Sequence, residues 1–400
     1  MGNDGYKIAF VEFGEQGSYQ EPQQLTNALR VIRQTEKPLV ITYVHGWQNN
    51  AKSHDVEAFG SLLARLNRAP AIRQAGFNTV GIYLSWRGRV TDLPLIKELS
   101  FWNRKATAER LASNYDCYDA IASISEAARK THGQGGQYTV LLGHSFGGLI
   151  VERAVAHAIN AEIHGHANAE QSMPADLMIV VNPASDSILA RQMINALYVR
   201  KTEGSRPLFV SITSTADWAT GKFFPLGTAS ASLTKGFNNV PVPGLSNTTE
   251  SERKYFTSTP GHNKTLINHF TRDLHRSIES PRGHTALESN LEHNLTGDVF
   301  ALDGRGGKLD LWQLKRIGDL DVPYWDISVD RSIIKDHGDL WNERAEAMMA
   351  AIFRMANPLI NRSAKPRATL HRAPDVNRLP ATPTASAAPR PEPPPRTSTR

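Results

Sequence analysis

One serine lies where the pattern of the sequence changes. Residues 138 to 158, YTVLLGHSFGGLIVERAVAHA, begin with a β-branched and apolar run, pass through Gly143-His144-Ser145-Phe146-Gly147, and continue with apolar residues at helical spacing. The pattern G-x-S-x-G between a strand and a helix is typical of a sharp turn that exposes a nucleophilic serine. Gly143 and Gly147 are expected because a side chain at either position would collide across that turn. The alternative is that Ser145 only caps the helix that follows it.

A second motif precedes the serine. The apolar run at 39 to 46 leads into VHGWQNN, residues 44 to 50, where Gly46 allows the backbone to turn after His45. Together with the serine motif, this resembles the α/β-hydrolase superfamily, and within it bacterial serine esterases and lipase-like hydrolases, over roughly residues 37 to 350. The resemblance implies an oxyanion hole made by the backbone amides of Trp47 and Phe146. The alternative for residues 44 to 50 is a turn at the end of a strand, with a tryptophan in the core.

The resemblance also implies the chain order serine, acid, histidine. His337, in IIKDHGDLWNERA, lies between the last predicted strand and the last predicted helix, and is the expected base. The alternative is an exposed loop histidine, with His262 as the main competitor. Asp217, just beyond the predicted strand at 208 to 213, is the expected acid. Asp186, at the start of a helical pattern, is the other position that some members of the family use.

These residues predict acyl transfer. Ser145 would attack an ester carbonyl, His337 would move the proton and Asp217 would stabilise the imidazolium, before water releases the acyl group. The same groups could act on an amide or a thioester. No cofactor or metal is implied, because the sequence has no metal-ligand spacing, no Rossmann pattern and no P-loop. The rival from another class is a catalytically silent scaffold that binds a partner.

Aromatic residues near predicted strand ends indicate an apolar acyl pocket, and hence a small-molecule or lipid ester as the substrate. Taken singly, each of them fits a place in the core better than a place in the wall of a substrate pocket. The residues are Trp47, Trp86, Phe101, Trp102, Trp218, Phe223 and Phe224.

The elements that must position these groups follow from the hydrophobic pattern. Apolar runs at 6–13, 39–46, 79–86, 138–145, 177–184, 208–213 and 322–329 are predicted strands, separated by predicted helices at 55–68, 103–130, 146–163 and 186–200, with a last helix at 340–356. Strands that are apolar throughout and joined by helices predict a doubly wound α/β fold with a mostly parallel sheet, of the α/β-hydrolase type. Residues 219 to 322, rich in Gly, Pro, Ser and Asn, are expected to form an irregular cap before the last strand.

Composition sets the remaining expectations. A hydrophobic fraction of 40% with 21% charged residues predicts one globular domain over residues 1–362. Residues 363–400 hold seven Lys or Arg against two acids, so this Pro- and Arg-rich tail, expected to be disordered, carries +5 of the net charge of +6. The remaining +1 gives no basis for nucleic-acid binding, and no partner for the tail can be named.

A single cysteine, Cys117, and the lack of a leader or membrane-spanning run predict a cytoplasmic protein.

Overall fold

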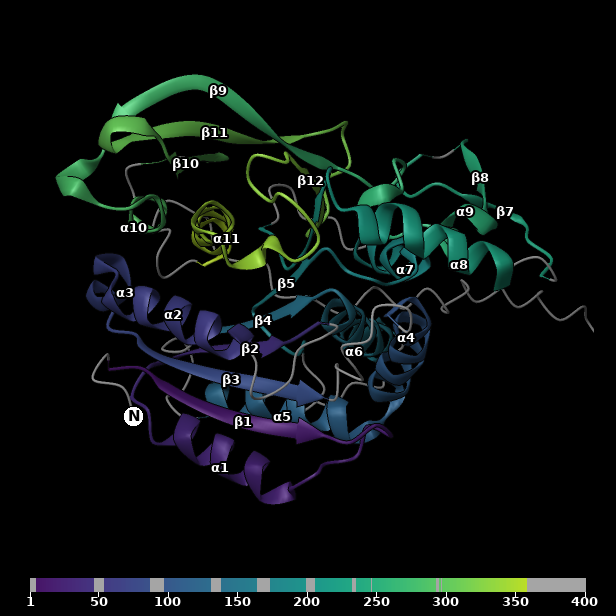
Figure 1. The fold of residues 1–400 in the computed structure, drawn as a ribbon, viewed down its shortest axis with the longest axis horizontal. Coiled ribbons are helices and arrows are strands. Elements are labelled where there is room, and N and C mark those ends of the chain that lie inside the picture. Colours follow the sequence, from purple (N-terminus) through teal and green to yellow (C-terminus); the bar gives the residue numbers. More distant parts are fainter. Residues whose placement is uncertain are drawn as a thin grey trace, which may run out of the picture.

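A large sheet is the main element of the computed structural model, which describes residues 5–46, 54–86, 97–130, 138–163, 173–198, 206–231, 235–245, 247–292, 295 and 297–357. In these residues ten strands pair side by side (Figure 1). From one edge to the other they are β1 (Lys7–Phe13), β3 (Asn78–Trp86), β2 (Pro38–Val44), β4 (Tyr138–His144), β5 (Leu177–Val181), β6 (Phe209–Ser214), β12 (Tyr324–Val329), β9 (His269–Glu279), β11 (Lys308–Arg316) and β10 (Val299–Asp303).

The sheet is mixed but mostly parallel. Every pairing from β1 to β9 is parallel, whereas β9 with β11 and β11 with β10 are antiparallel. The α/β class and the mostly parallel sheet that the sequence predicts are therefore confirmed. A parallel arrangement brings the carboxyl ends of neighbouring strands to one edge of the sheet, where ligands bind in open α/β folds.

Helices cover both faces of the sheet. One face carries α1 (Pro22–Arg33), α4 (Lys97–Ser113), α5 (Tyr115–Lys130), α6 (Phe146–Ile163) and α7 (Ser187–Tyr198), and the other carries α2 (His54–Arg68), α3 (Pro70–Gln74), α10 (Ala286–Leu291) and α11 (Glu343–Ala356). In Figure 1, β1 and β3 run between α1 and α5 on one side and α2 on the other.

Strand β2 shows why both faces are covered. All seven of its residues are buried; Val40 and Val44 join the core on the α1 side, and Leu39, Ile41 and Tyr43 join the core on the α2 side. Successive side chains of a strand point to opposite faces, so a strand that is apolar throughout needs a helix layer on each.

The expectation of an irregular cap over residues 219–322 is wrong for residues 269–316, where β9, β10 and β11 extend the main sheet. In β11, buried Leu309, Trp312 and Leu314 alternate with less buried residues, with one interruption at the bulge between Leu311 and Trp312, because one face packs on the core while the other meets solvent. These strands were not predicted because many of their residues are polar and because turn residues lie between them.

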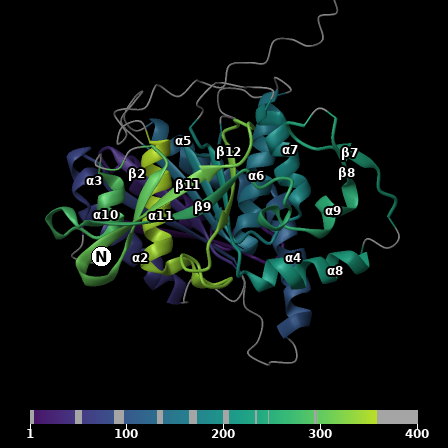
Figure 2. The same cartoon turned by 90° about the horizontal axis from the view of Figure 1, so that it is seen from above.

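The rest of that segment contains shorter elements. It holds a π-helical turn at Ala219–Phe223, α8 (Phe224–Ala231), a two-stranded antiparallel sheet of β7 (Asn239–Pro241) with β8 (Thr249–Ser251), and α9 (Glu252–Thr257). These elements gather beside α7 at one end of the molecule (Figure 2).

One predicted helix is two. The helical pattern at 103–130 is divided between α4 and α5 at Asn114, whose side-chain oxygen accepts a hydrogen bond from the Asp116 amide at 2.9 Å. An asparagine in this role supports the start of a new helix rather than continuation of the old one.

Two further observations concern the C-terminal tail and the helices. The Pro- and Arg-rich tail at 363–400 lies outside the described residues. None of the helices in the described part of the chain has the length and apolar character that crossing a membrane requires.

Two carboxyl groups are fully buried between the sheet and α6. Burial raises the pKa of Asp326, on β12, to about 8. Burial, with a smaller contribution from the charge of Asp326, also raises the pKa of Glu152, on α6, to about 8 despite a hydrogen bond from Ser185. At neutral pH both groups are therefore mainly protonated.

Asp326→Asn is expected to weaken the dependence of stability on pH. The folded-state pKa lies above the ordinary value of 3.8, so the folded protein keeps this proton while the unfolded chain releases it, and stability falls as pH rises from about 4 towards 8. Urea unfolding at pH 5 and pH 8 should show that the variant loses less free energy of unfolding than wild type, by on the order of 3 kcal/mol. Asp319→Asn, at an exposed position, is the control. Equal pH dependence in wild type and Asp326→Asn would contradict the expectation.

Candidate active site

Three loops meet at the carboxyl edge of the sheet. They follow β4, β6 and β12, which lie with β5 in the order β4-β5-β6-β12 and are mutually parallel. Ser145 comes directly after β4, Asp217 lies just beyond β6, and His337 lies in the loop between β12 and α11.

Ser145 occupies a strained turn. Its φ of 55° is in the left-handed region, which non-glycine residues rarely adopt. The turn is held by neighbouring backbone, since the Ser145 amide donates to the Val181 carbonyl at 3.0 Å and the Ser145 carbonyl accepts from the Ala184 amide at 3.1 Å. The surrounding structure therefore fixes this serine at the junction of β4 and α6.

The glycines of the serine motif are places of close backbone approach. A Cβ atom on Gly147 would lie 2.0 Å from the Val44 carbonyl oxygen, and one on Gly143 would lie 2.8 Å from the Gly147 oxygen. A side chain at either position would displace the backbone that forms the turn.

Ser145, His337 and Asp217 form one hydrogen-bonded chain. Nε2 of His337 is 2.8 Å from Oγ of Ser145, and Nδ1 of His337 is 3.0 Å from both carboxylate oxygens of Asp217. Ser145 and Asp217 are buried, whereas the His337 side chain is 22% exposed. Because a carboxylate only accepts, Nδ1 carries the proton in the neutral ring, and Nε2 is free to accept from the serine hydroxyl.

The carboxyl group of Asp217 is kept ionised. Burial acts to raise its pKa, but the positive charge and N–H of His337, with hydrogen bonds from the Thr220 hydroxyl and amide, outweigh it and lower the pKa. The amide of Ala219 donates to the same carboxylate at 3.0 Å. These bonds also hold the carboxylate in one orientation towards the imidazole.

The two competing residues do not join this chain. Asp186, at the start of α7, lies 3.8 Å from the ammonium group of Lys105, and burial raises its pKa. His262 bonds through Nδ1 to the Thr259 hydroxyl at 3.0 Å. Its Nδ1 is also 3.5 Å from the Thr220 hydroxyl, which places His262 beside Asp217 without a bond to Ser145.

His45 and Gly46 shape the turn next to the serine. The buried His45 ring stacks on Trp86 at 5.6 Å; its Nδ1 donates to the Gly46 carbonyl at 2.8 Å, and its Nε2 accepts from the Trp86 amide at 3.1 Å. Burial lowers its pKa, so the ring is neutral and fully used in hydrogen bonds. A Cβ on Gly46 would lie 2.9 Å from the Ser145 Cβ, so the chain passes directly against the serine turn here.

Of the two expected oxyanion-hole residues, the structure describes Phe146 but not Trp47. Phe146 is the buried first residue of α6, so its backbone amide lies in the amino-terminal turn of that helix, directly after Ser145. Trp47 lies outside the described residues.

Four of the seven aromatic residues have described side chains, and these four differ in exposure. Trp86 and Phe224 are buried, and Phe224 faces the Lys105 ammonium group at 5.4 Å. Trp218 is 54% exposed and packs edge-on against Phe223 with ring centroids 4.0 Å apart. Trp47 and the side chains of Phe101 and Trp102 lie outside what the structure describes.

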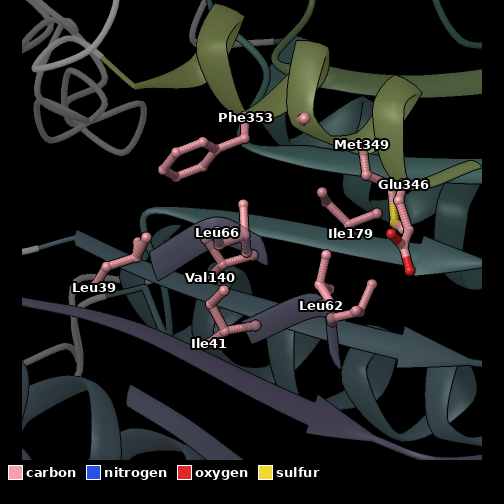
Figure 3. A pocket seen from close by; sticks show the side chains of 11 residues that line it. Leu39, Ile41, Leu62, Leu66, Val140, Ile179, Glu346, Met349 and Phe353 are labelled. Carbon is pink, nitrogen blue, oxygen red and sulfur yellow. The ribbon is translucent and has the colours of Figure 1, made fainter. Parts of the chain in front are cut away.

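An apolar cavity lies away from the serine, between the middle of the sheet and helices α2 and α11 (Figure 3). Its wall includes Ile41, Val140, Ile179 and Phe353, with the carboxyl group of Glu346, paired with Arg65, at one end. The lining contains neither Ser145 nor its two partners, so this cavity is not the acyl pocket that the sequence predicts.

The structure adds residues that the sequence did not single out. Thr220 orients Asp217, and Asn182, just after β5, bonds to the loop that carries His337. The available signal for Asn182 was its place in VVNPA, a polar residue ending an apolar strand on the site's edge of the sheet. Among the described residues no group of three or more His, Cys, Asp or Glu could hold a metal ion.

Comparison with known proteins found no matching protein-family model, and no curated protein or solved structure with significant similarity to the chain. The chemistry of the site therefore has to be inferred from its geometry.

Proposed function

We propose that this protein is a serine hydrolase of the α/β-hydrolase type that cleaves carboxylic esters. The observation that carries the proposal is the hydrogen-bonded chain from Ser145 through His337 to the buried carboxylate of Asp217. A nucleophile, a base within hydrogen-bond reach of it and a third group that orients the base are the recurring parts of nucleophilic acyl transfer.

In the proposed mechanism, His337 Nε2 takes the hydroxyl proton as Ser145 Oγ attacks the ester carbonyl. Asp217 stabilises the resulting imidazolium through Nδ1. The tetrahedral intermediate collapses when the imidazolium gives its proton to the departing alkoxide, which leaves an acyl group on Ser145. Water then attacks the acyl group with His337 again as the base, and the carboxylic acid departs as the Ser145 hydroxyl is restored.

The amides of Phe146 and Trp47 are proposed as the donors to the oxyanion. Phe146 follows the serine at the amino terminus of α6, where the helix dipole favours negative charge. The contribution of Trp47 rests on its position after Gly46, which lies against the serine turn.

We propose an ester with an apolar acyl group as the substrate, because Trp218, the residue after Asp217, packs against Phe223 and leaves more than half of its own surface exposed. The single cysteine, Cys117, is buried and has no partner for a disulfide, which supports a location in the reducing cytoplasm.

A partition experiment tests for the acyl-enzyme. The p-nitrophenyl, phenyl and 4-methylumbelliferyl esters of butyric acid share an acyl group but differ in leaving group, so hydrolysis in aqueous methanol should give one common ratio of methyl butyrate to butyric acid. The ratio is common because methanol and water compete for the same butyryl-Ser145. A ratio that depends on the leaving group would contradict the covalent step, and no turnover of any of the three would contradict the hydrolase itself.

A further inference from the structure

Two buried side chains bind the backbone of His337. The carbonyl oxygen of His337 accepts hydrogen bonds from Nε2 of His144 at 2.7 Å and from Nδ2 of Asn182 at 3.0 Å. Nδ2 of Asn182 also reaches the carbonyl oxygen of Asp336 at 3.2 Å. Both donors come from the carboxyl ends of sheet strands, β4 for His144 and β5 for Asn182.

Asn182 also binds the segment that carries Asp217. Its Oδ1 accepts from the amide of Ser214, the last residue of β6, at 2.9 Å. The hydroxyl of Ser214 in turn donates to the carbonyl of Ile334 at 2.6 Å, in the loop of His337. One amide side chain therefore joins the loop of the base to the strand that leads to the acid.

The geometry of Asn182 suits this role and restricts the residue type. Its φ is 47°, a left-handed conformation that asparagine tolerates better than most residues, and it is fully buried. Its own amide donates to the Ile212 carbonyl at 2.7 Å, which fixes the backbone from which the side chain extends.

His144 is a neutral donor. Burial, aided by the positive charge of His337, lowers the pKa of His144 to about 4. Because a carbonyl oxygen only accepts, the proton of the neutral ring lies on Nε2. His144 directly precedes Ser145, so it joins the nucleophile's turn to the backbone of the base, with the two imidazole rings 5.2 Å apart.

We propose that Asn182 and His144 are positioning residues that hold the His337 imidazole between Ser145 and Asp217. The inference rests on the proposed function for its kinetic consequence, but its structural content concerns the loop alone. His337 lies in a loop rather than on a strand or helix, and a displacement of about 1 Å in a catalytic group can cost on the order of a hundredfold in rate. The hydrogen bonds from these two side chains to the His337 carbonyl fix the backbone from which the imidazole extends.

Asn290 provides a matched control for Asn182. It is also fully buried, its Nδ2 donates to two carbonyl oxygens, those of Ala301 and Ala347, each at 2.8 Å, and its Oδ1 accepts from the Ala301 amide at 2.8 Å. It lies on α10, packed against α11 rather than at the serine edge. Replacing either asparagine by alanine therefore removes the same number and kinds of hydrogen bonds.

The two alanine variants should separate stability from positioning. Both are expected to lower the melting temperature, but at a temperature where both are folded only Asn182→Ala should lose kcat for p-nitrophenyl butyrate, by about a hundredfold, with KM changed less than about twofold. A kcat for Asn182→Ala equal to that of Asn290→Ala would overturn the proposal. Absence of turnover in wild type would instead count against the proposed function.

A spectroscopic measurement tests the same inference without catalysis. The proton between His337 Nδ1 and Asp217 should give a low-field NMR signal in wild type and in Asn290→Ala, and the signal should shift or broaden in Asn182→Ala because the imidazole is no longer held. An unchanged signal in Asn182→Ala would overturn the proposal whatever the activity.

Substitution of His144 supplies an independent arm, should Asn182→Ala fail to fold. His144→Gln can present an amide donor near the position of Nε2, whereas His144→Phe keeps a ring of similar shape without a donor. We expect kcat to fall at least about tenfold further in His144→Phe than in His144→Gln. Equal kcat values in the two variants would contradict a role for the hydrogen bond to His337.

Discussion

Ser145→Ala is expected to lower kcat for p-nitrophenyl butyrate by on the order of a millionfold, because the residues of such a chain act as a unit and alanine lacks the hydroxyl that would form the acyl-enzyme. The protein should stay folded, since alanine removes only the hydroxyl from a turn that backbone hydrogen bonds hold. Turnover of purified protein, followed by nitrophenolate release, measures the effect.

Ser125→Ala is the matched control for this substitution. Ser125 is a buried serine on α5, away from the loops that carry the site, and its replacement should leave kcat unchanged. If Ser145→Ala kept more than a small fraction of wild-type turnover while remaining folded, another nucleophile would have to be responsible.

Asp217→Asn is expected to reduce kcat by about ten-thousandfold without unfolding the protein. The asparagine amide would donate to Nδ1 of His337, which places the ring proton on Nε2 and prevents that nitrogen from accepting the Ser145 proton. The melting temperature should change little in comparison, because the amide keeps the shape of the carboxylate and one oxygen can still accept from Thr220.

Asp186→Asn distinguishes this role from a purely local one. Asp186 lies near Lys105 at the start of α7 and is not bonded to His337 among the described residues, so its amide variant should keep near-wild-type kcat. The opposite outcome, collapse of turnover in Asp186→Asn and retention in Asp217→Asn, would reverse the assignment of the acid.

The strands that could be predicted are those whose own residues show how they are buried. Strands such as β2 and β4 are buried on both faces and are therefore apolar at every position, which makes them visible without a structure. The antiparallel strands β9 and β11 have one solvated face, so more than half of their residues are polar, and their pairing depends on segments distant in sequence. Nothing local distinguishes such a strand from a polar loop.

The residues of the candidate site were also predictable only in part. Ser145 could be selected because its turn requires glycines at fixed distances along the chain, and Asp217 and His337 because each follows a strand that ends at the same edge of the sheet. Asn182 acts through bonds to segments that follow other strands, so its role becomes visible only when β5, β6 and the loop after β12 are placed together. When the hydrogen-bond partners of a residue lie in separate segments, the sequence of any one segment does not indicate the contact.

Labelling with a fluorophosphonate tests the central claim most directly, because the reagent phosphonylates a serine only where a base activates it and the site accepts the tetrahedral phosphorus. Intact-mass spectrometry of the wild-type protein should show a single adduct, and peptide mapping should place it on Ser145. Prior incubation with the butyrate ester should slow the labelling, and both Ser145→Ala and His337→Ala should remain unlabelled. A wild-type protein that stays unmodified, or an adduct that persists in Ser145→Ala, would contradict the account.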